Sequence, residues 1–362
     1  MTRTMNFNAG PSCMPLPVLE EARAEFLDFN DTGMSILEVS HRSPEYDAVH
    51  KETSANLLKL LGLGDDYAVF FMTGGASTQF ALLPMNFLGA GQTADYINTG
   101  TWSKKAIKEA SSIGTVNVAG TGLEGEKFVR CPSDDACNFT PGAAYVHITS
   151  NNTIAGTQYH TFPEVDAPLV ADMSSDILWR PTDASKFHMI YAGAQKNLGP
   201  AGVTIVVIKK SWVEEKAADG LLTMFSYKTY LDKDSLMNTA PVFPIYMVGK
   251  TLKWIAGRGG LDSVYAENKQ KAELIYTTMD ENPDFFSSPV EKQSRSYMNV
   301  VFRMPTEELE KQFIEQGKLR NMGGIKGHRS VGGIRFSIYN AVPLDWVQQV
   351  AEFMKEFAAK NG

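Results

Sequence analysis

The chain has 362 residues, of which 43% are hydrophobic and 21% charged, and its formal net charge is −7. This composition is typical of a folded globular protein and excludes collagen, coiled coil and intrinsic disorder. The negative charge disfavours nucleic acid as a partner. The three cysteines form no pattern of disulfide or zinc-binding type, so we expect no metal. Neither a signal-peptide stretch nor a membrane-length apolar run is visible, and we expect a cytoplasmic protein without a membrane partner.

Short apolar runs recur along the first 210 residues, and most of them end in small polar residues. In chain order they are residues 68–72, 95–97, 144–149, 169–171, 189–192 and 203–208. Helical patterns follow the first two of these runs, one up to residue 87 and one at 104–112, so we predict buried strands of a mostly parallel sheet flanked by helices, an α/β fold. In such sheets ligands bind beyond the carboxyl ends of the strands. The polar residues that follow five of the runs are therefore expected to converge on one site.

The pattern changes after a glycine-rich stretch at 257–260. Beyond it we expect a helix at 261–280, a strand at 298–303, a helix at 306–316, a strand at 334–338 and a closing helix at 344–360. This order is typical of a smaller α+β domain. We predict a large cofactor-binding domain of residues 13–258, and a small domain of residues 259–362 together with residues 1–12.

One glycine motif is a misleading candidate for a nucleotide site. Residues 120–125 read GTGLEG and match the dinucleotide-binding pattern, but the sequence after them is not that of an amphipathic helix. Because the pyrophosphate site needs a helix that opens on the glycine loop, we interpret the motif as a turn. The chain contains no P-loop motif.

Asp172 and Lys196 are the pair that best indicates chemistry. Asp172 ends one apolar run and Lys196 follows the next, a separation that fits two neighbouring strands and their crossover. Pyridoxal phosphate needs such a pair, a lysine that attaches the cofactor covalently and a carboxylate that keeps the ring nitrogen protonated. The alternative is an Asp172 that caps a turn and a solvated Lys196. The small residues on both sides of Lys196, AGAQ and NLGPAG, favour the first interpretation.

Other candidates are weaker when each is taken alone. The TGGAS stretch at 73–77 suits a phosphate at a helix N-terminus, or is an ordinary turn. Trp102 stacks on a planar cofactor or belongs to the core, and Thr153 is a candidate partner for a phenolic oxygen. The basic residues at 41–42 and 326–329 bind an anion or are surface charges. Arg335 lies within a strand-like run, where a single charge needs a partner or ligand.

Taken together, these segments resemble the phosphoserine aminotransferases, in the class V branch of the fold-type-I pyridoxal-phosphate enzymes. The matching segments are FNAGP at 7–11, EVSHR at 38–42, TGGAS at 73–77, YAGAQKNLGPAG at 191–202, NTAP at 238–241, KGHR at 326–329 and SIYNA at 337–341. The AGAQKNLGPAG string is highly specific. KGHR with SIYNA separates this family from its class V relatives.

The resemblance implies a role for each candidate residue. Lys196 carries the cofactor and moves the proton, and Asp172 pairs with the ring nitrogen. Trp102 stacks on the ring, and Thr153 contacts its oxygen. The cofactor phosphate is held by Ala76, Ser77 and Gln195, joined by Asn238 and Thr239 from the second subunit of a homodimer. Arg335 takes the substrate α-carboxylate, and the distal anion is taken by His41, Arg42, His328 and Arg329. Ala9, Ala76 and Ser77 depart from a common family pattern, which leaves contact details open.

The implied reaction is amino transfer between L-glutamate and 3-phosphohydroxypyruvate, giving 2-oxoglutarate and O-phosphoserine in serine synthesis. We leave open whether 4-phosphohydroxythreonine of vitamin B6 synthesis is also a substrate. One alternative is another class V enzyme, of serine–glyoxylate or cysteine desulfurase type. A desulfurase needs a mobile cysteine in a late glycine-rich loop, which Cys13, Cys131 and Cys137 do not provide. A non-catalytic cofactor-binding regulator is the third class, and it would need no distal anion cluster.

Overall fold

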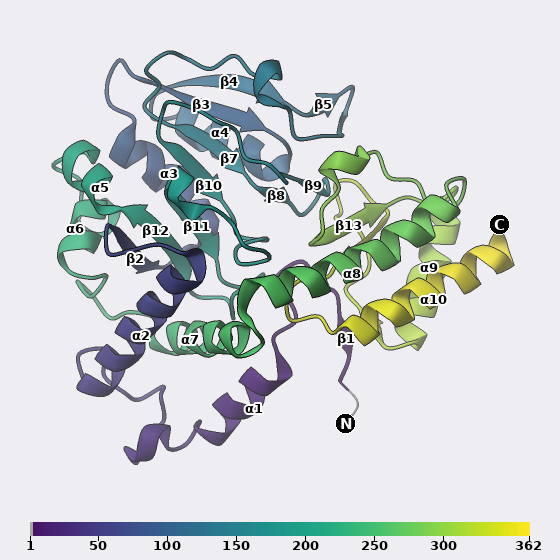
Figure 1. Ribbon diagram of the computed structural model, residues 1–362, viewed down its shortest axis with the longest axis horizontal. Helices are drawn as coiled ribbons and strands as arrows, with labels where there is room; N and C mark the ends of the chain where they lie inside the picture. The colour runs from purple at the N-terminus through teal and green to yellow at the C-terminus, as the bar shows by residue number, and fades with distance from the viewer. Residues whose placement is uncertain (1–2) are drawn as a thin grey trace.

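The computed structural model describes residues 3–362, and a seven-stranded sheet lies at its centre (Figure 1). Across the sheet the strands are β2 Tyr67–Met72, β12 Thr204–Lys209, β11 Phe187–Gly193, β10 Leu169–Asp172, β7 Val146–Thr149, β3 Thr93–Asn98 and β4 Thr115–Thr121. Only β12 is antiparallel to its neighbours. The other six strands therefore end at one edge. The predicted α/β fold with a mostly parallel sheet is confirmed.

Helices cover both faces of this sheet. Along β2, Val69 and Phe71 point into one hydrophobic cluster, whereas Phe70 and Met72 point into another on the opposite face. This alternation follows from the two-residue period of a strand and explains why the strands are apolar throughout. The first face is covered by α1 Leu16–Ala24, α2 Pro44–Leu61 and α7 Val242–Gly257, and the second by α3 Gly75–Phe87, α4 Thr101–Ser111, α5 Lys210–Lys216 and α6 Tyr227–Asp232.

The C-terminal third forms a separate hydrophobic cluster beside the sheet. Its elements are α8 Gly260–Glu281, β13 Asn299–Phe302, α9 Glu307–Leu319, β14 Met322–Gly323, β15 Ile334–Ser337 and α10 Leu344–Asn361. β13 and β15 pair antiparallel, and α8 packs along α10 (Figure 1). Val264 of α8 packs in a cluster of the sheet, whereas Ala272 and Ile275 pack in the C-terminal one. The domain boundary at 258/259 thus stays a prediction, because α8 contributes to both.

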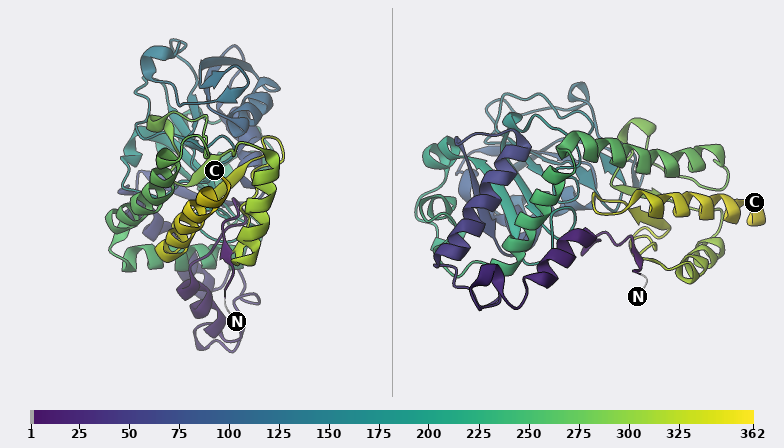
Figure 2. Two further views of the ribbon diagram at one scale, coloured as in Figure 1. Left: turned by 90° about the vertical axis from the view of Figure 1, so that its right-hand side faces the viewer. Right: turned by 60° about the horizontal axis from the view of Figure 1, so that its bottom comes forward.

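The N-terminal segment connects the C-terminal elements to the edge of the sheet. Strand β1, Met5–Asn6, pairs in parallel with β14, and Met5 and Phe7 pack in the C-terminal cluster. In Figure 2 the N-terminal strand lies against the C-terminal part of the chain. A few residues later, the backbone N–H of Ser12 donates to the carbonyl of Gln195 at 3.0 Å. Residues from both ends of the chain thus meet next to Lys196.

The remaining elements are short. They are the hairpins β5 Leu123–Glu124 with β6 Lys127–Phe128 and β8 Asn151–Asn152 with β9 Thr157–Gln158, and the 3-10 turns η1 Phe29–Asp31, η2 Asp134–Ala136, η3 Ala184–Lys186, η4 Thr223–Phe225 and η5 Lys292–Ser294. The GTGLEG motif lies at the end of β4 and in the β5–β6 hairpin, and no helix opens on it. Within residues 3–362, no helix is both long and apolar enough to cross a membrane.

Helix α4 begins three residues earlier than the helix pattern at 104–112 predicts. Its N-cap is Gly100, and Trp102 lies in the first turn rather than in the preceding loop. A Cβ on Gly100 would lie 2.3 Å from Oδ1 of Asn152, so a glycine is needed where this turn packs on β8. The early start fixes the Trp102 ring at the edge of the sheet.

Candidate active site

Asp172 and Lys196 come together at the carboxyl edge of the sheet. Asp172 is the last residue of β10, and it is paired in register with Tyr191 of the neighbouring parallel strand β11. Lys196 follows the end of β11, in a turn of small residues. The two side chains are close enough for each charge to influence the pKa of the other. The sheet therefore places a carboxylate and an amine on the same side of one edge.

The Lys196 side chain is half-buried beside an aromatic ring. Its Nζ lies 5.0 Å from the centre of the Trp102 ring. A Cβ added to Gly10 would lie only 3.1 Å from Cγ of Lys196, and the hydroxyl of Ser12 donates to the Lys196 carbonyl. Burial lowers the pKa of the Lys196 amine, and the neighbouring Arg335 lowers it further, whereas Asp172 opposes the shift. A lowered pKa increases the fraction of neutral, nucleophilic amine.

Asp172 is 4% exposed and is oriented by a serine of its own turn. Oδ1 of Asp172 accepts from the backbone N–H of Ser174 at 3.0 Å and from its hydroxyl at 2.6 Å. The Ser174 oxygen in turn accepts from the N–H of Gly193 at 3.1 Å. Burial raises the pKa of the Asp172 carboxyl, and the Lys196 charge opposes this. Within residues 3–362 the second oxygen, Oδ2, receives no hydrogen bond, so it is free for a further donor.

Trp102, Thr153 and Arg335 form a connected group above this pair. The indole N–H of Trp102 donates to the hydroxyl of Thr153 at 3.0 Å, and Nη1 of Arg335 donates to the Thr153 carbonyl at 3.1 Å. Arg335 comes from β15, so the C-terminal elements contribute a charge to the sheet edge. Burial lowers the pKa of the guanidinium, and its Nε is buried with no hydrogen-bond partner among residues 3–362. Such a group needs an anion.

The N-terminus of α3 supplies unpaired backbone donors at the same edge. Gly74 is the N-cap of this 13-residue helix and provides no capping side chain. Its φ is +94°, and a Cβ there would lie 1.9 Å from Oγ1 of Thr78, so a side chain cannot be accommodated. Ala76 and Ser77 follow in the first turn, and Gln195 is half-buried just after β11. Free N–H groups and the helix dipole suit a phosphate.

A cavity of about 610 Å³ lies next to Arg335. It is lined by Thr101, Glu126–Phe128, Ile154, Ala155, Ser287–Pro289, Val301–Arg303, Gly327, His328, Ser330–Gly332, Ile334 and Arg335. Burial lowers the pKa of His328, and neighbouring positive charges lower it further.

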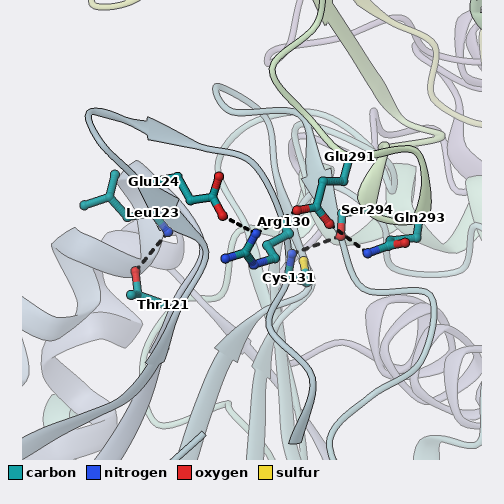
Figure 3. Close-up of polar contacts among 8 residues, drawn as sticks. All are labelled: Thr121, Leu123, Glu124, Arg130, Cys131, Glu291, Gln293 and Ser294. Atoms are coloured by element: carbon teal, nitrogen blue, oxygen red, sulfur yellow. Dashed lines mark hydrogen bonds and ion pairs between the residues drawn. The ribbon is translucent and has the colours of Figure 1, made fainter. Parts of the chain in front are cut away.

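An ion pair joins the β5–β6 hairpin to the C-terminal region. Figure 3 shows Arg130 between Glu124 and Glu291. Arg130 Nη1 lies 2.7 Å from Glu291 Oε1, which ties the β5–β6 hairpin to the C-terminal region.

His328 lines the cavity next to Arg335, whereas within residues 3–362 no hydrogen bond joins His41, Arg42, Asn238 or Thr239 to this group. Arg42 Nε is 3.1 Å from His41 Nε2, and both residues precede α2, whereas His328 and Arg329 lie between β14 and β15. Arg42 and Arg329 are exposed. Asn238 and Thr239 are also exposed, shortly before α7.

Sequence reasoning did not single out two serines of the site. Ser174 fixes the Asp172 carboxylate, and Ser12 holds the backbone of the Lys196 turn. A serine two residues after an aspartate is a known local hydrogen-bonding pattern, and this signal could have identified Ser174. The contact of Ser12 joins residues at opposite parts of the chain, and no local pattern shows it.

Known proteins share the sequence pattern and the fold of this chain. A sequence model of the family described as aminotransferase class-V matches residues 4–350. A phosphoserine aminotransferase of Desulfatibacillum aliphaticivorans is 56% identical over 99% of both chains. The solved phosphoserine aminotransferase of Bacillus circulans subsp. alkalophilus has 50% identity and a TM-score of 0.97, with 99% of each chain covered. The chain belongs to the phosphoserine aminotransferase family of class-V aminotransferases.

A second solved structure comes from a more distant member of the same family. The solved structure from Trichomonas vaginalis is described as bound to pyridoxal phosphate. It is 38% identical to this chain, with a TM-score of 0.93 over 98% of this chain and 100% of the other. At this similarity the two chains share the backbone fold, including the sheet whose edge carries Asp172 and Lys196.

Proposed function

We propose that this chain is a pyridoxal-phosphate-dependent aminotransferase that exchanges the amino group between L-glutamate and 3-phosphohydroxypyruvate. The products are 2-oxoglutarate and O-phosphoserine, the amino acid made in serine synthesis. The observation that carries this proposal is a half-buried lysine close to a buried carboxylate, near an arginine. Among residues 3–362, one carboxylate oxygen and the arginine Nε have no hydrogen-bond partner. A cytoplasmic location stays a prediction from the sequence.

The residues at the sheet edge fit pyridoxal phosphate. Oδ2 of Asp172 is free for a protonated ring nitrogen, and the Trp102 ring beside Lys196 offers a flat stacking surface. The N-terminus of α3, with Ala76 and Ser77, suits the phosphate together with Gln195, and Thr153 suits the ring oxygen. When bound, the cofactor supplies an aldehyde that bonds covalently to amines and a ring that accepts electrons.

The protein side chains then hold and move protons. Asp172 is a buried anion that holds a proton on the ring nitrogen, because separating the two charges in a water-poor site is unfavourable. Lys196, once its amine is free, takes the proton from the substrate Cα in the first half-reaction. In the second half-reaction it donates a proton to the Cα of the new amino acid. Its lowered pKa leaves part of the amine neutral and able to accept that proton.

Substrate recognition needs positive charge at two positions. Arg335 faces the Thr153 carbonyl at the site and is proposed to take the α-carboxylate. His41, Arg42, His328 and Arg329 are proposed to take the distal anion. That anion is a carboxylate in glutamate and a phosphate in phosphoserine, and guanidinium and imidazole groups bind both.

We propose that two chains form a homodimer with shared sites. Leu16, Leu19, Phe26 and Leu27 of the α1 region are exposed, Leu27 by 81%, and large apolar patches of this kind mark interfaces. An apolar groove of about 480 Å³ lies there, lined by Leu19, Ala22, Arg23, Phe26, Leu27, Phe243 and Met247. Asn238 and Thr239 precede the helix that carries Phe243. A second copy seated on this groove is proposed to receive that pair in its own cofactor site.

The direct test is turnover of purified protein with a panel of amino-group acceptors. We expect 3-phosphohydroxypyruvate with glutamate to give the highest kcat/KM, with glyoxylate and unphosphorylated hydroxypyruvate far lower. Preference for glyoxylate would instead indicate an enzyme of serine–glyoxylate type. Binding of cofactor without turnover of any acceptor would indicate a regulator. Both outcomes contradict the proposal.

A further inference from the structure

A second buried carboxylate, Asp176, lies in the same turn as Asp172. It is 3% exposed, and in the described part of the chain, residues 3–362, its carboxyl group has two hydrogen-bond partners, the neutral side chains of Ser150 and Gln158. Sequence reasoning assigned it no role. A buried carboxylate paired only with neutral groups is costly when it is ionised, so its protonation state needs an explanation.

The direction of the Gln158 contact is fixed by a residue of the C-terminal region. The backbone N–H of Tyr297 donates to Oε1 of Gln158 at 2.8 Å, so that side-chain atom is the acceptor oxygen. The other end of the amide is therefore the NH₂ group, which donates to Oδ2 of Asp176 at 3.1 Å. Oδ2 thus acts as a hydrogen-bond acceptor.

The other oxygen of Asp176 shares Ser150 with the backbone of Asp172. The Ser150 hydroxyl is in hydrogen-bond contact with Oδ1 of Asp176 and lies 3.0 Å from the carbonyl oxygen of Asp172. Both of these would be acceptors if Asp176 were ionised, and a hydroxyl has one hydrogen to give. If Oδ1 carries a proton, it donates to Ser150, and Ser150 donates to Asp172. Every contact is then satisfied.

We propose that Asp176 is a neutral carboxylic acid and a positioning residue for Asp172. Its proton completes a directed series of hydrogen bonds that runs from Tyr297 through Gln158, Asp176 and Ser150 to the Asp172 carbonyl. The series joins the C-terminal region to the strand end that carries the catalytic carboxylate, and it leaves Asp172 as the single anion of this turn. The inference rests on the proposed function, because it concerns the residue that holds the cofactor ring nitrogen.

The electrostatic surroundings agree with a neutral acid. Burial raises the pKa of Asp176 to about 7, and the charge of Asp172 raises it, while Ser150, Gln158 and Arg180 oppose the shift. Arg180 is directed elsewhere, since its Nη2 donates to the His160 carbonyl at 2.6 Å. The titratable and charged groups whose pKa is coupled to Asp176 are Cys131, Asp172, Arg180, Lys196 and Tyr339.

The first experiment compares full-length wild type with Asp176→Asn and Asp166→Asn. Asparagine imitates the neutral acid, since its NH₂ donates and its oxygen accepts, and Asp166 is an exposed control. At pH 6 the infrared spectrum of wild type is expected to contain a protonated-carboxyl C=O band that Asp176→Asn lacks and Asp166→Asn keeps. Retention of the band in Asp176→Asn, or its absence from wild type, overturns the proposal.

The second experiment follows unfolding by urea as a function of pH. A raised pKa in the folded state means that the contribution of Asp176 to stability is lost as the pH rises from about 4 toward 7. The urea midpoint of Asp176→Asn is therefore expected to rise relative to wild type over that range, with Asp166→Asn parallel to wild type. A difference that is constant with pH contradicts a neutral Asp176.

The third experiment separates positioning from simple packing. In the holoenzyme, Asp176→Ala breaks the series and is expected to lower kcat roughly tenfold or more, and Asp176→Asn is expected to recover most of that loss. Equal loss in both variants, despite folded proteins, contradicts the proposed relay. If wild type shows no phosphoserine turnover, the proposed function fails, while the infrared and urea measurements still decide the state of Asp176.

Discussion

The two halves of the candidate site differ in how firmly the chain holds them. At the sheet edge, Asp172 is buried and bonded to Ser174, and Lys196 is bonded through its carbonyl to Ser12 and lies beside the Trp102 ring. The residues proposed for the distal anion lie on loops, and Arg42 and Arg329 are exposed. The fold thus preorganises the groups proposed for the chemistry, whereas those proposed for selectivity need a ligand or a second subunit to order them. Substitutions in the first half should therefore cost more.

The largest effect is expected from Lys196→Ala. It removes both the attachment point and the proton carrier, so kcat should fall by about 10³-fold or more, within the range of lost acid–base catalysis. The exposed Lys360→Ala serves as the control and should match wild type. Borohydride reduction of wild type followed by peptide mapping locates the cofactor, and a label on any other lysine contradicts the assignment.

Asp172→Asn tests the buried carboxylate at the sheet edge. The amide is similar in size but cannot hold a proton on the ring nitrogen, so we expect cofactor to bind while kcat falls by roughly 10²- to 10³-fold. Absorbance spectroscopy checks cofactor content, and stopped-flow measurement with glutamate alone checks the first half-reaction. A variant that reacts as fast as wild type would refute the proposed role.

Arg329→Ala tests the residues proposed to bind the distal anion, which lie on loops. Loss of a charge-assisted contact with the distal anion costs about 2 kcal/mol, which is roughly 30-fold in kcat/KM for both glutamate and phosphoserine. The matched control is Arg320→Ala, whose guanidinium pairs with Glu356 on the surface and should leave both constants unchanged. Unchanged constants in Arg329→Ala itself would show that the distal anion binds elsewhere.

The smallest signal comes from mixing two inactive proteins. Lys196→Ala is unfolded, mixed and refolded with the double variant Asn238→Ala/Thr239→Ala. If sites are shared, a mixed dimer has one site with both defects and one intact site. About half of the dimers are mixed, so about a quarter of wild-type activity should return. With mixed dimers confirmed, activity no higher than in the unmixed controls would show that each site is built from one chain.

The strands and the paired charges were predictable because their signals are local. An apolar run such as 203–208 is readable as a buried strand wherever it occurs, and Asp172 and Lys196 follow such runs directly. The helix beginning at Thr101 was placed too late because the polar residues at its start resemble a loop. In that case packing against Asn152, a distant residue, decides the boundary.

The rest depends on contacts between distant segments. Asp176 follows Asp172 in an ordinary polar turn, and only Gln158 and Tyr297 reveal that it is buried in a directed hydrogen-bond series. Strand β1 is two residues long and has no periodicity to detect. Taken alone, the basic residues at 41–42 and 326–329 are more typical of surface charge than of an anion site, and the single chain leaves them largely at its surface.

The pairing of the two chain ends has a consequence for how the protein is made. The carbonyl of Arg3 accepts a hydrogen bond from Asn321, 318 positions later, and β1 pairs with β14 beside it. On the ribosome the first residues emerge long before these partners exist, at roughly 5–20 residues per second. Strand β1, which leads into the segment next to Lys196, must therefore stay without its strand partner until synthesis is almost finished. An active site with this architecture is completed only at the end of translation.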